Sequence, residues 1–212
     1  INELACSYGP PCLPFAGEAL NALGIGGPTQ STEDERGMGG PTVGNPVAVG
    51  TGAKWQVERD FDGAGPFPLH FVRTYISQVP KSGGLIGVKW SASYFQSVKL
   101  PPSIEGGPYP VEERPDRVLL RRPDGSYYQF DWRTDAYVAD ANIPGTLERL
   151  TSGTNTAAWE YTTPQDTVEH YDAQGRLQYI RHRAGLTHTV SHDEYQRPIK
   201  VTDSYGRELN FT

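Results

Sequence analysis

The stretch Glu169–Thr212 restricts the fold most, because the motif Asp-x-x-x-Arg occurs three times in it. Asp begins turns since its carboxylate accepts the amide two residues on, and a Gly before the Arg supplies a positive φ. With the further reversal at Ala184-Gly185, a turn falls about every ten residues. This spacing predicts an antiparallel meander of repeated hairpins. The predicted turn residues are Asp172, Gly175, Arg176, Asp193, Arg197, Asp203, Gly206 and Arg207.

The residues before this stretch also read as short strands separated by turns. Trp90–Leu100 is the longest predicted strand, and Phe95 and Val98 break its alternation, which indicates a bulge or burial on both faces. Pro123-Asp124-Gly125-Ser126 predicts a tight two-residue hairpin. The chain after residue 45 is therefore expected to form one continuous antiparallel sheet that curls. Further predicted strands are Val47–Val49, Lys54–Asp60, Leu69–Tyr75, Val118–Leu120, Tyr127–Trp132, Thr146–Leu150, Ala157–Tyr161, Thr167–Tyr171, Leu177–Arg181, Thr187–Ser191, Ile199–Thr202 and Glu208–Thr212.

The repeated motif resembles the YD repeat of the Rhs proteins. The resemblance rests on Tyr171-Asp172-x-x-Gly175-Arg176-Leu177 and its two successors, although His192 replaces the Tyr and Gln196 replaces the Gly in the second copy. Upstream motifs are similar to the domain that precedes those repeats. They are Gly44-Asn45-Pro46-Val47 with Thr51-Gly52, Leu69-x-Phe71-x-Arg73-x-Tyr75, Gly87-x-x-Trp90-x-x-Ser93-Tyr94 and Arg122-Pro123-Asp124-Gly125.

The resemblance implies a structural role. Rhs proteins wind a long YD-repeat sheet into a hollow shell around a C-terminal effector, commonly a toxin that is delivered to competing bacteria. This chain would be the opening of such a shell, non-catalytic, without a cofactor, and secreted or displayed on the cell surface. Its partners would be the remainder of the same chain and the effector. We also expect self-association through an open sheet edge, with Ile199, Val201, Leu209 and Phe211 partly exposed.

The overall prediction is an all-β fold in three parts. Residues 1–44 form an irregular Pro/Gly-rich arm with at most one short helix, at Phe15–Leu23. Residues 45–165 form the pre-repeat β-domain, and residues 166–212 form the first YD-type hairpins. Cys6 and Cys12 flank Gly9-Pro10-Pro11 and can close a disulfide loop suited to an exported protein, or remain reduced thiols.

Composition argues against two kinds of partner. The formal net charge of −6 and the pI near 5.4 argue against nucleic acid, which needs a concentrated basic surface. No apolar run approaches the length of a membrane-spanning helix, and the first residues do not form a recognisable signal peptide.

The sequence provides no pattern that is typical of an active site. His170, His182, His188 and His192 are close in sequence, but half-exposed imidazoles on a sheet explain them better than a metal site. Most available carboxylates occupy turn positions and no spacing singles out a pair, and no nucleophile elbow or phosphate-binding loop is present. We therefore predict no catalytic residue, no metal and no cofactor.

A second functional class stays open at this point. Flat aromatic side chains on a sheet suit sugar stacking, so a free-standing secreted β-module could bind carbohydrate or a cell-surface protein. Core packing and cross-strand pairing are the simpler explanation of the same residues. The aromatic residues that would face such a ligand are Trp55, Trp90, Trp132 and Trp159.

Overall fold

The computed structural model describes residues 53–78, 83–84, 86–101, 114–152 and 156–211. All regular elements in these ranges are β-strands, and all the strand pairs are antiparallel, so the predicted all-β class is confirmed. No helix in the described ranges has the length and apolar character to cross a membrane. The predicted arm 1–44, its helix, and the strand Val47–Val49 lie outside the described residues.

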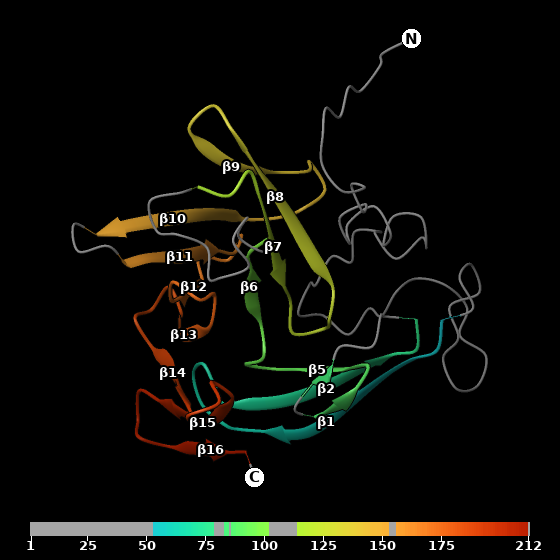
Figure 1. Cartoon of the computed structure of the whole chain (residues 1–212). Coiled ribbons are helices and arrows are strands. Elements are labelled where there is room, and N and C mark those ends of the chain that lie inside the picture. Colours follow the sequence, from blue (N-terminus) through green and yellow to red (C-terminus); the bar gives the residue numbers. More distant parts are fainter. Residues whose placement is uncertain (1–52, 79–82, 85, 102–113, 153–155, 212) are drawn as a thin grey trace.

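The strands form one large sheet and two small ones (Figure 1). The large sheet has eleven strands in the order β16-β15-β14-β13-β12-β11-β10-β9-β8-β7-β6, so each strand pairs with its neighbours along the chain. The small sheets have the orders β1-β2-β5 and β3-β4. The strands are β1 (Trp55–Asp62), β2 (His70–Ile76), β3 (Gly83–Gly84), β4 (Gly87–Val88), β5 (Trp90–Ala92), β6 (Ser97–Lys99), β7 (Arg117–Arg121), β8 (Tyr127–Arg133), β9 (Ala136–Ala139), β10 (Thr146–Ser152), β11 (Thr156–Thr162), β12 (Val168–Tyr171), β13 (Leu177–Arg181), β14 (Thr187–His192), β15 (Pro198–Asp203) and β16 (Glu208–Asn210).

The prediction of one continuous sheet after residue 45 is wrong, and so is the long strand Trp90–Leu100. A turn at Ser93–Tyr94 divides this segment into β5 and β6, which belong to different sheets. Tyr94 has a φ of 68°, and the Phe95 amide donates back to the Ala92 carbonyl at 3.2 Å. The broken alternation at Phe95 therefore marks the point where the chain leaves one sheet and enters the next.

Six hairpins of the large sheet share one turn geometry. Six turns within the described residues have the same two backbone hydrogen bonds. The amide of the first residue donates to the carbonyl of the fifth, and the amide of the fourth donates to the carbonyl of the first. Three residues thus form each loop, and the third has a positive φ. The Pro123-Asp124-Gly125-Ser126 turn is one of these, so its loop is one residue longer than predicted. The six turns span residues 122–126, 163–167, 172–176, 182–186, 193–197 and 203–207.

The turn 193–197 keeps this geometry without a glycine. Gln196 takes the left-handed position with a φ of 64°, and both turn hydrogen bonds are 2.9 Å long. Replacement of Gly by Gln in the second copy of the motif therefore leaves the hairpin as tight as its neighbours.

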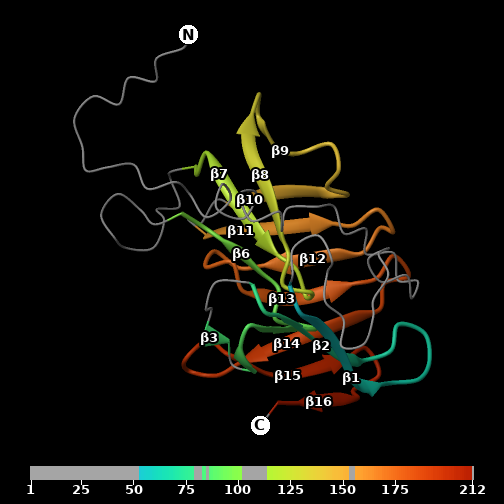
Figure 2. The same cartoon turned by 90° about the vertical axis from the view of Figure 1, so that its right-hand side faces the viewer.

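The large sheet curls until one of its edges meets its own middle. Strands β10–β16 stack in a ladder, and β6–β8 cross them steeply (Figure 2). The edge strand β6 meets the β12–β13 turn, where the Val98 amide donates to the Gly175 carbonyl at 2.9 Å and Ser97 forms an isolated bridge with Arg176. The sheet curls without closing into a barrel, because among the described residues this short contact alone joins β6 to the turn.

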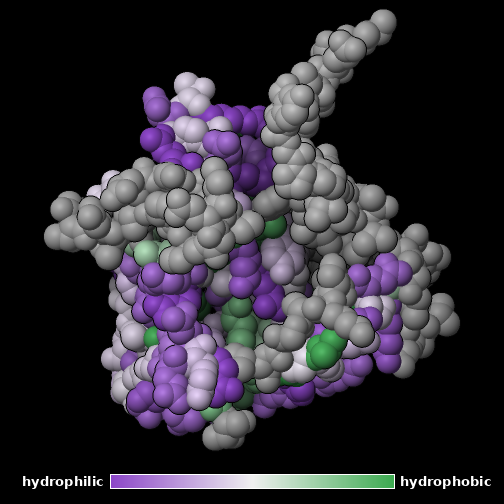
Figure 3. Space-filling view, in the orientation of Figure 1, coloured by the Kyte–Doolittle hydropathy of each residue, from purple (hydrophilic) through white to green (hydrophobic). Residues whose placement is uncertain are grey.

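Large side chains fill the inside of the curl. Trp159, Tyr161, Tyr171 and Phe130 are each at most 1 % exposed. The outer surface seen in Figure 3 is mostly hydrophilic where it is described, with hydrophobic residues in small patches. The core also contains Leu69, Tyr94, Val98, Val118, Leu120, Tyr128, Tyr137, Leu147, Leu177, Val190 and Val201.

The last strands match the expected exposed edge only in part. Ile199 is 40 % exposed, but Val201 is fully buried within the core, so the prediction for Val201 is wrong. Leu209 and Phe211 are half-buried. The Phe211 ring contacts Phe71 and Phe95, with centroid distances of 5.2 and 5.5 Å, which joins the end of the chain to the β1-β2-β5 sheet.

Gly175 and Gly185 provide a matched pair for testing the contact between β6 and the turn. Both have a positive φ, 77° and 83°, so alanine at either costs about 1–2 kcal/mol of left-handed strain. A Cβ on Gly175 would also overlap the Val98 carbonyl, whereas one on Gly185 meets nothing within 4 Å. We expect Gly175→Ala to lower the free energy of unfolding by about 3–5 kcal/mol and Gly185→Ala by no more than about 2. Equal losses in urea denaturation would contradict the contact.

Candidate functional site: an inner row of polar residues

Three buried polar residues lie in one row across the inner face of the large sheet. Glu169, His188 and Asp203 are 4 %, 1 % and 7 % exposed. Residues directly opposite each other on paired strands point to the same face, so the register places them in line. The row continues through apolar neighbours and consists of Leu147, Tyr161, Glu169, Ile180, His188 and Asp203, one from each of β10 to β15. We call these six residues the inner row.

Glu169 is bound by an arginine that comes from the β7–β8 turn. Arg122 Nη1 donates to Glu169 Oε2 at 2.6 Å and Nη2 donates to Oε1 at 3.0 Å, while the Tyr171 hydroxyl donates to Oε2 at 2.6 Å. The Arg122 guanidinium also lies 4.7 Å from the centre of the Tyr161 ring. This arrangement satisfies a buried carboxylate with a bidentate ion pair.

Burial and the Glu169 charge both shift the pKa values of Arg122 and Tyr171. Burial disfavours the charge on Arg122, but the Glu169 carboxylate outweighs burial and raises the pKa of the guanidinium. Burial, with the adjacent carboxylate, raises the pKa of Tyr171 well above its ordinary value. Tyr171 therefore remains a hydrogen-bond donor at neutral pH. Gln96 Nε2 approaches Glu169 Oε1 at 3.5 Å, and Gln96 Oε1 has no partner among the described residues.

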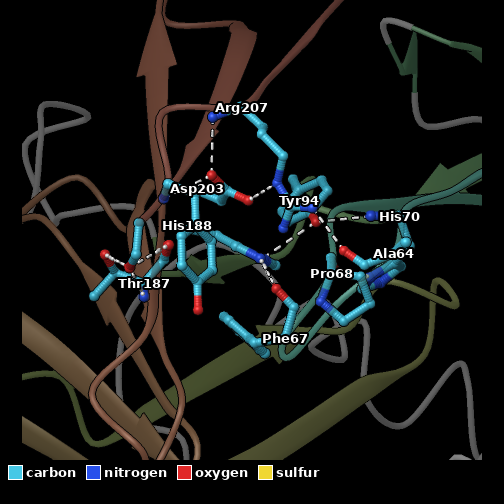
Figure 4. A network of polar contacts seen from close by, with 11 residues as sticks. Ala64, Phe67, Pro68, His70, Tyr94, Thr187, His188, Asp203 and Arg207 are labelled. Carbon is cyan, nitrogen blue, oxygen red and sulfur yellow. Dashed lines mark hydrogen bonds and ion pairs between the residues drawn. The ribbon is translucent and has the colours of Figure 1, made fainter.

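His188 is bound by the loop before β2 and by the turn after β5 (Figure 4). His188 Nε2 lies 3.1 Å from the Phe67 carbonyl oxygen, and Nδ1 lies 3.3 Å from the Tyr94 hydroxyl. The Phe67 ring stacks on the imidazole at 3.9 Å between centroids. Burial is the main cause that lowers the pKa of His188, and burial raises the pKa of Tyr94 to about 12.

Asp203 closes the last turn of the described sheet, and the other two motif copies do the same. In each copy one carboxylate oxygen accepts the Arg backbone amide at 2.8–2.9 Å, and the other accepts Arg Nε at 2.6 Å. Burial disfavours the charged form, but the amide and guanidinium donors outweigh it and lower the pKa of Asp193 and Asp203. The pairs are Asp172–Arg176, Asp193–Arg197 and Asp203–Arg207.

Arg207 also links the last turn to the loop between β1 and β2. Its Nη1 donates to the Ala64 carbonyl at 2.6 Å, in the loop that also contains Phe67. Each polar member of the inner row is thus tied, directly or through its turn, to a residue from the part of the chain before β8. The contacts come from Ala64, Phe67, Tyr94, Gln96 and Arg122.

The four tryptophans do not share one surface. Trp159 is 1 % exposed in the core, and Trp132 packs edge-on against Tyr137 with Arg114 4.0 Å from its ring centre. Trp55 and Trp90 lie opposite Ile76 and Tyr75, which are consecutive residues of β2. Because consecutive strand residues face opposite ways, Trp55 and Trp90 lie on different faces of the small sheet.

The clustered histidines also have separate surroundings. His170 stacks on Tyr179 at 4.7 Å and its Nδ1 lies 3.2 Å from Glu160, whereas His188 is in the inner row. In the part of the chain that the structure describes, no three His, Cys, Asp or Glu side chains are grouped closely enough to hold a metal ion. Cys6 and Cys12 lie outside the described residues.

A known domain family matches the part of the chain that supplies the partners of the inner row. Residues 44–130 match DUF6531, a domain of unknown function. The matched segment includes Phe67, Tyr94, Gln96 and Arg122, while Glu169, His188 and Asp203 follow it in the chain. No curated protein matches the sequence.

The sequence indicates neither Glu169 nor the partners of the inner row. Arg122 is predicted only as part of a turn motif, and no local pattern singles out Phe67, Gln96 or Glu169. The alternation of β14 gave one available signal, because His188 stands two residues before the apolar Val190 and so shares its buried face. The partners of Glu169 and His188 lie 47 and 94 or more residues away, which no local pattern reveals.

The Arg122–Glu169 pair predicts a non-additive pair of substitutions. Arg122→Met or Glu169→Leu alone leaves an unpaired buried charge and should lower the free energy of unfolding by about 3–5 kcal/mol. The double variant removes both charges and should cost no more than either single change. Lys200→Met, in the exposed pair with Glu208, should cost less than about 1 kcal/mol. Additive losses in urea denaturation would contradict the assignment of Arg122–Glu169 as a coupled buried pair.

Proposed function

We propose that this chain is a non-catalytic structural segment of an Rhs/YD-repeat protein. In this role it forms part of a β-shell that encapsulates or presents a C-terminal effector, a toxin used in competition between bacteria. The protein that contains it is secreted or displayed at the bacterial surface. Its partners are the remainder of the same chain and the effector.

The observation that carries the proposal is the repetition of one self-contained turn. Each Asp–Arg turn closes with its own carboxylate, guanidinium and backbone amides, and so needs nothing from the neighbouring hairpin. The same turn geometry closes six of the connections between neighbouring strands of the eleven-stranded sheet, including every one from β11 to β16. A unit of this kind supports growth of a long sheet by addition of further copies.

The last described strand supports continued growth. Among the described strands, β16 pairs with β15 alone. Ladder bonds join Asp203 with Arg207 and Phe211 with Ile199, so alternation turns the amides of Glu208 and Asn210 outward. These outward amides can accept another strand, from a further repeat or from a second copy of the chain.

The buried charges support a structural role over a catalytic one. Glu169 is neutralised by Arg122, and Asp203 is held by Arg207 and two turn amides. Carboxylates bound in this way are suited to fixing geometry, whereas a general base needs a free lone pair near a substrate.

The size of the native protein tests the proposed function. An antibody raised against this chain should detect, in extracts or culture medium of the source cells, a band far above 23.3 kDa. The band should carry further YD repeats and an effector when it is sequenced by mass spectrometry. A single band near 23.3 kDa would contradict the proposal and favour a module that acts alone.

The open edge predicts self-association of the isolated chain. Sedimentation velocity should show a sedimentation coefficient that rises with protein concentration. Asn210→Pro removes one outward donor without removing a ladder bond and should reduce this rise, whereas Asn210→Ala should not. A chain that stays monomeric at all concentrations, or two variants with equal behaviour, would contradict association through β16.

A further inference from the structure

The loop between β1 and β2 is held against the end of the large sheet by a small number of polar contacts. Within the loop, the Gly63 amide donates to the Leu69 carbonyl at 2.7 Å, and Phe67 has a φ of 50°. Outside it, the Ala64 carbonyl accepts Arg207 Nη1, and the Phe67 carbonyl faces His188 Nε2. Figure 4 shows both carbonyls pointing toward β14 and the β15–β16 turn.

The contacts of His188 define its proton positions. A carbonyl oxygen only accepts hydrogen bonds, so Nε2 carries the proton that it donates to Phe67. Nδ1 is then unprotonated and accepts the Tyr94 hydroxyl at 3.3 Å. The Tyr94 oxygen in turn accepts the His70 amide at 3.3 Å. Donors and acceptors are matched when His188 is neutral.

A second proton on His188 breaks this match. It would occupy Nδ1, where the Tyr94 hydroxyl now donates, so Tyr94 would have to turn its proton away from its acceptor. The imidazole is 1 % exposed, and a charge placed there loses its hydration.

The charged groups around His188 do not remove this cost. Arg207, from the β15–β16 turn, and His70, from the start of β2, both oppose a positive charge, while Asp203 favours it. Asp203 is already bound by the Arg207 side chain and by turn amides. The His182 ring also stacks on the Phe67 ring, at 5.2 Å between centroids.

We propose that His188 is an acid-sensitive latch between the N-terminal loop and the repeat strands. Neutral His188 holds the loop 63–69 and the Tyr94 turn on β14. Protonation releases both, and exposes the inner face of β14 and β15. The Asp–Arg turns keep the large sheet intact, because their charged pairs do not depend on this histidine. The inference rests on the geometry of this chain and not on the proposed function.

The direction of the pH effect follows from the depressed pKa. Because burial lowers the pKa of His188 below its ordinary value of about 6.5, the released state binds the proton first as pH falls. The docked state is therefore fully favoured above about pH 6.5 and loses stability below it. Burial also lowers the pKa of His192, so this residue needs a control.

Hydrogen exchange measured by mass spectrometry at about pH 7.5 and about pH 5, corrected for intrinsic exchange rates, tests the latch. In the wild-type protein, peptides that cover residues 63–72 and 92–96 should exchange at least about tenfold faster at the lower pH. Peptides from β10 to β12 should change less. His192→Gln should behave like the wild type.

His188→Gln is the decisive variant. Its amide can donate to the Phe67 carbonyl and accept from the Tyr94 hydroxyl, and it does not titrate. Exchange in residues 63–72 should therefore become independent of pH in this variant. An acid response equal to that of the wild type, or a wild type with no acid response, would overturn the proposal.

Tyr94→Phe covers the case in which His188→Gln does not fold. The variant leaves His188 buried and removes the hydroxyl oxygen that could rotate to accept a proton from Nδ1, so the acid-induced increase in exchange should be at least as large as in the wild type. A clearly smaller increase would overturn the proposal.

Discussion

The three-residue turn closed by Asp and Arg is the interaction on which the rest of this structure depends. A left-handed third residue reverses the chain, and the aspartate carboxylate binds the returning amide and the arginine side chain together. Each of the three Asp–Arg turns is satisfied locally, so the sheet can extend strand by strand through the repeats. The side chains between the turns remain free to specify the inner and outer faces.

The inner face then determines how the N-terminal part of the chain is placed. Glu169 and His188 are buried polar groups within an apolar core, and such groups destabilise a fold unless they are paired. Their partners come from the segment that matches DUF6531, through Arg122, Tyr94 and Phe67. The large sheet also continues across residue 165, where β11 pairs with β12. The matched segment and the repeats thus fit together through specific polar contacts as well as through the shared core.

Local chemistry explains which parts of the fold the sequence could predict. Asp172, Gly175 and Arg176 lie within one turn, so their motif predicts both the reversal and the strands beside it. The strand β9 was missed because its hairpin uses Thr134-Asp135, both with positive φ, where sequence rules expect a pair such as Asn-Gly or Asp-Gly. The change of sheet at Tyr94 was missed for a similar reason, since a tyrosine rarely adopts a φ of 68°.

The candidate site was harder to predict than the fold because its contacts join distant parts of the chain. Glu169 reads as an ordinary strand residue, and only the curl of the sheet brings Arg122 to it. The tryptophans were prominent in the sequence, yet they lie in separate surroundings, with Trp159 in the core. The rare tryptophans did not indicate where the site lies. A polar residue at a strand position whose alternation predicts burial was a better indicator of the site.

We expect the β1-β2-β5 sheet and the large sheet to unfold as one cooperative unit, because the inner row joins them. Urea unfolding of two double variants tests this expectation. Trp132→Phe/Trp159→Phe keeps Trp55 and Trp90, which report on the β1-β2-β5 sheet. Trp55→Phe/Trp90→Phe keeps Trp132 and Trp159, which report on the large sheet. At neutral pH, the fluorescence transition of each variant should coincide with its own circular dichroism transition. A small-sheet transition at clearly lower urea, with the large sheet still folded, would contradict the account.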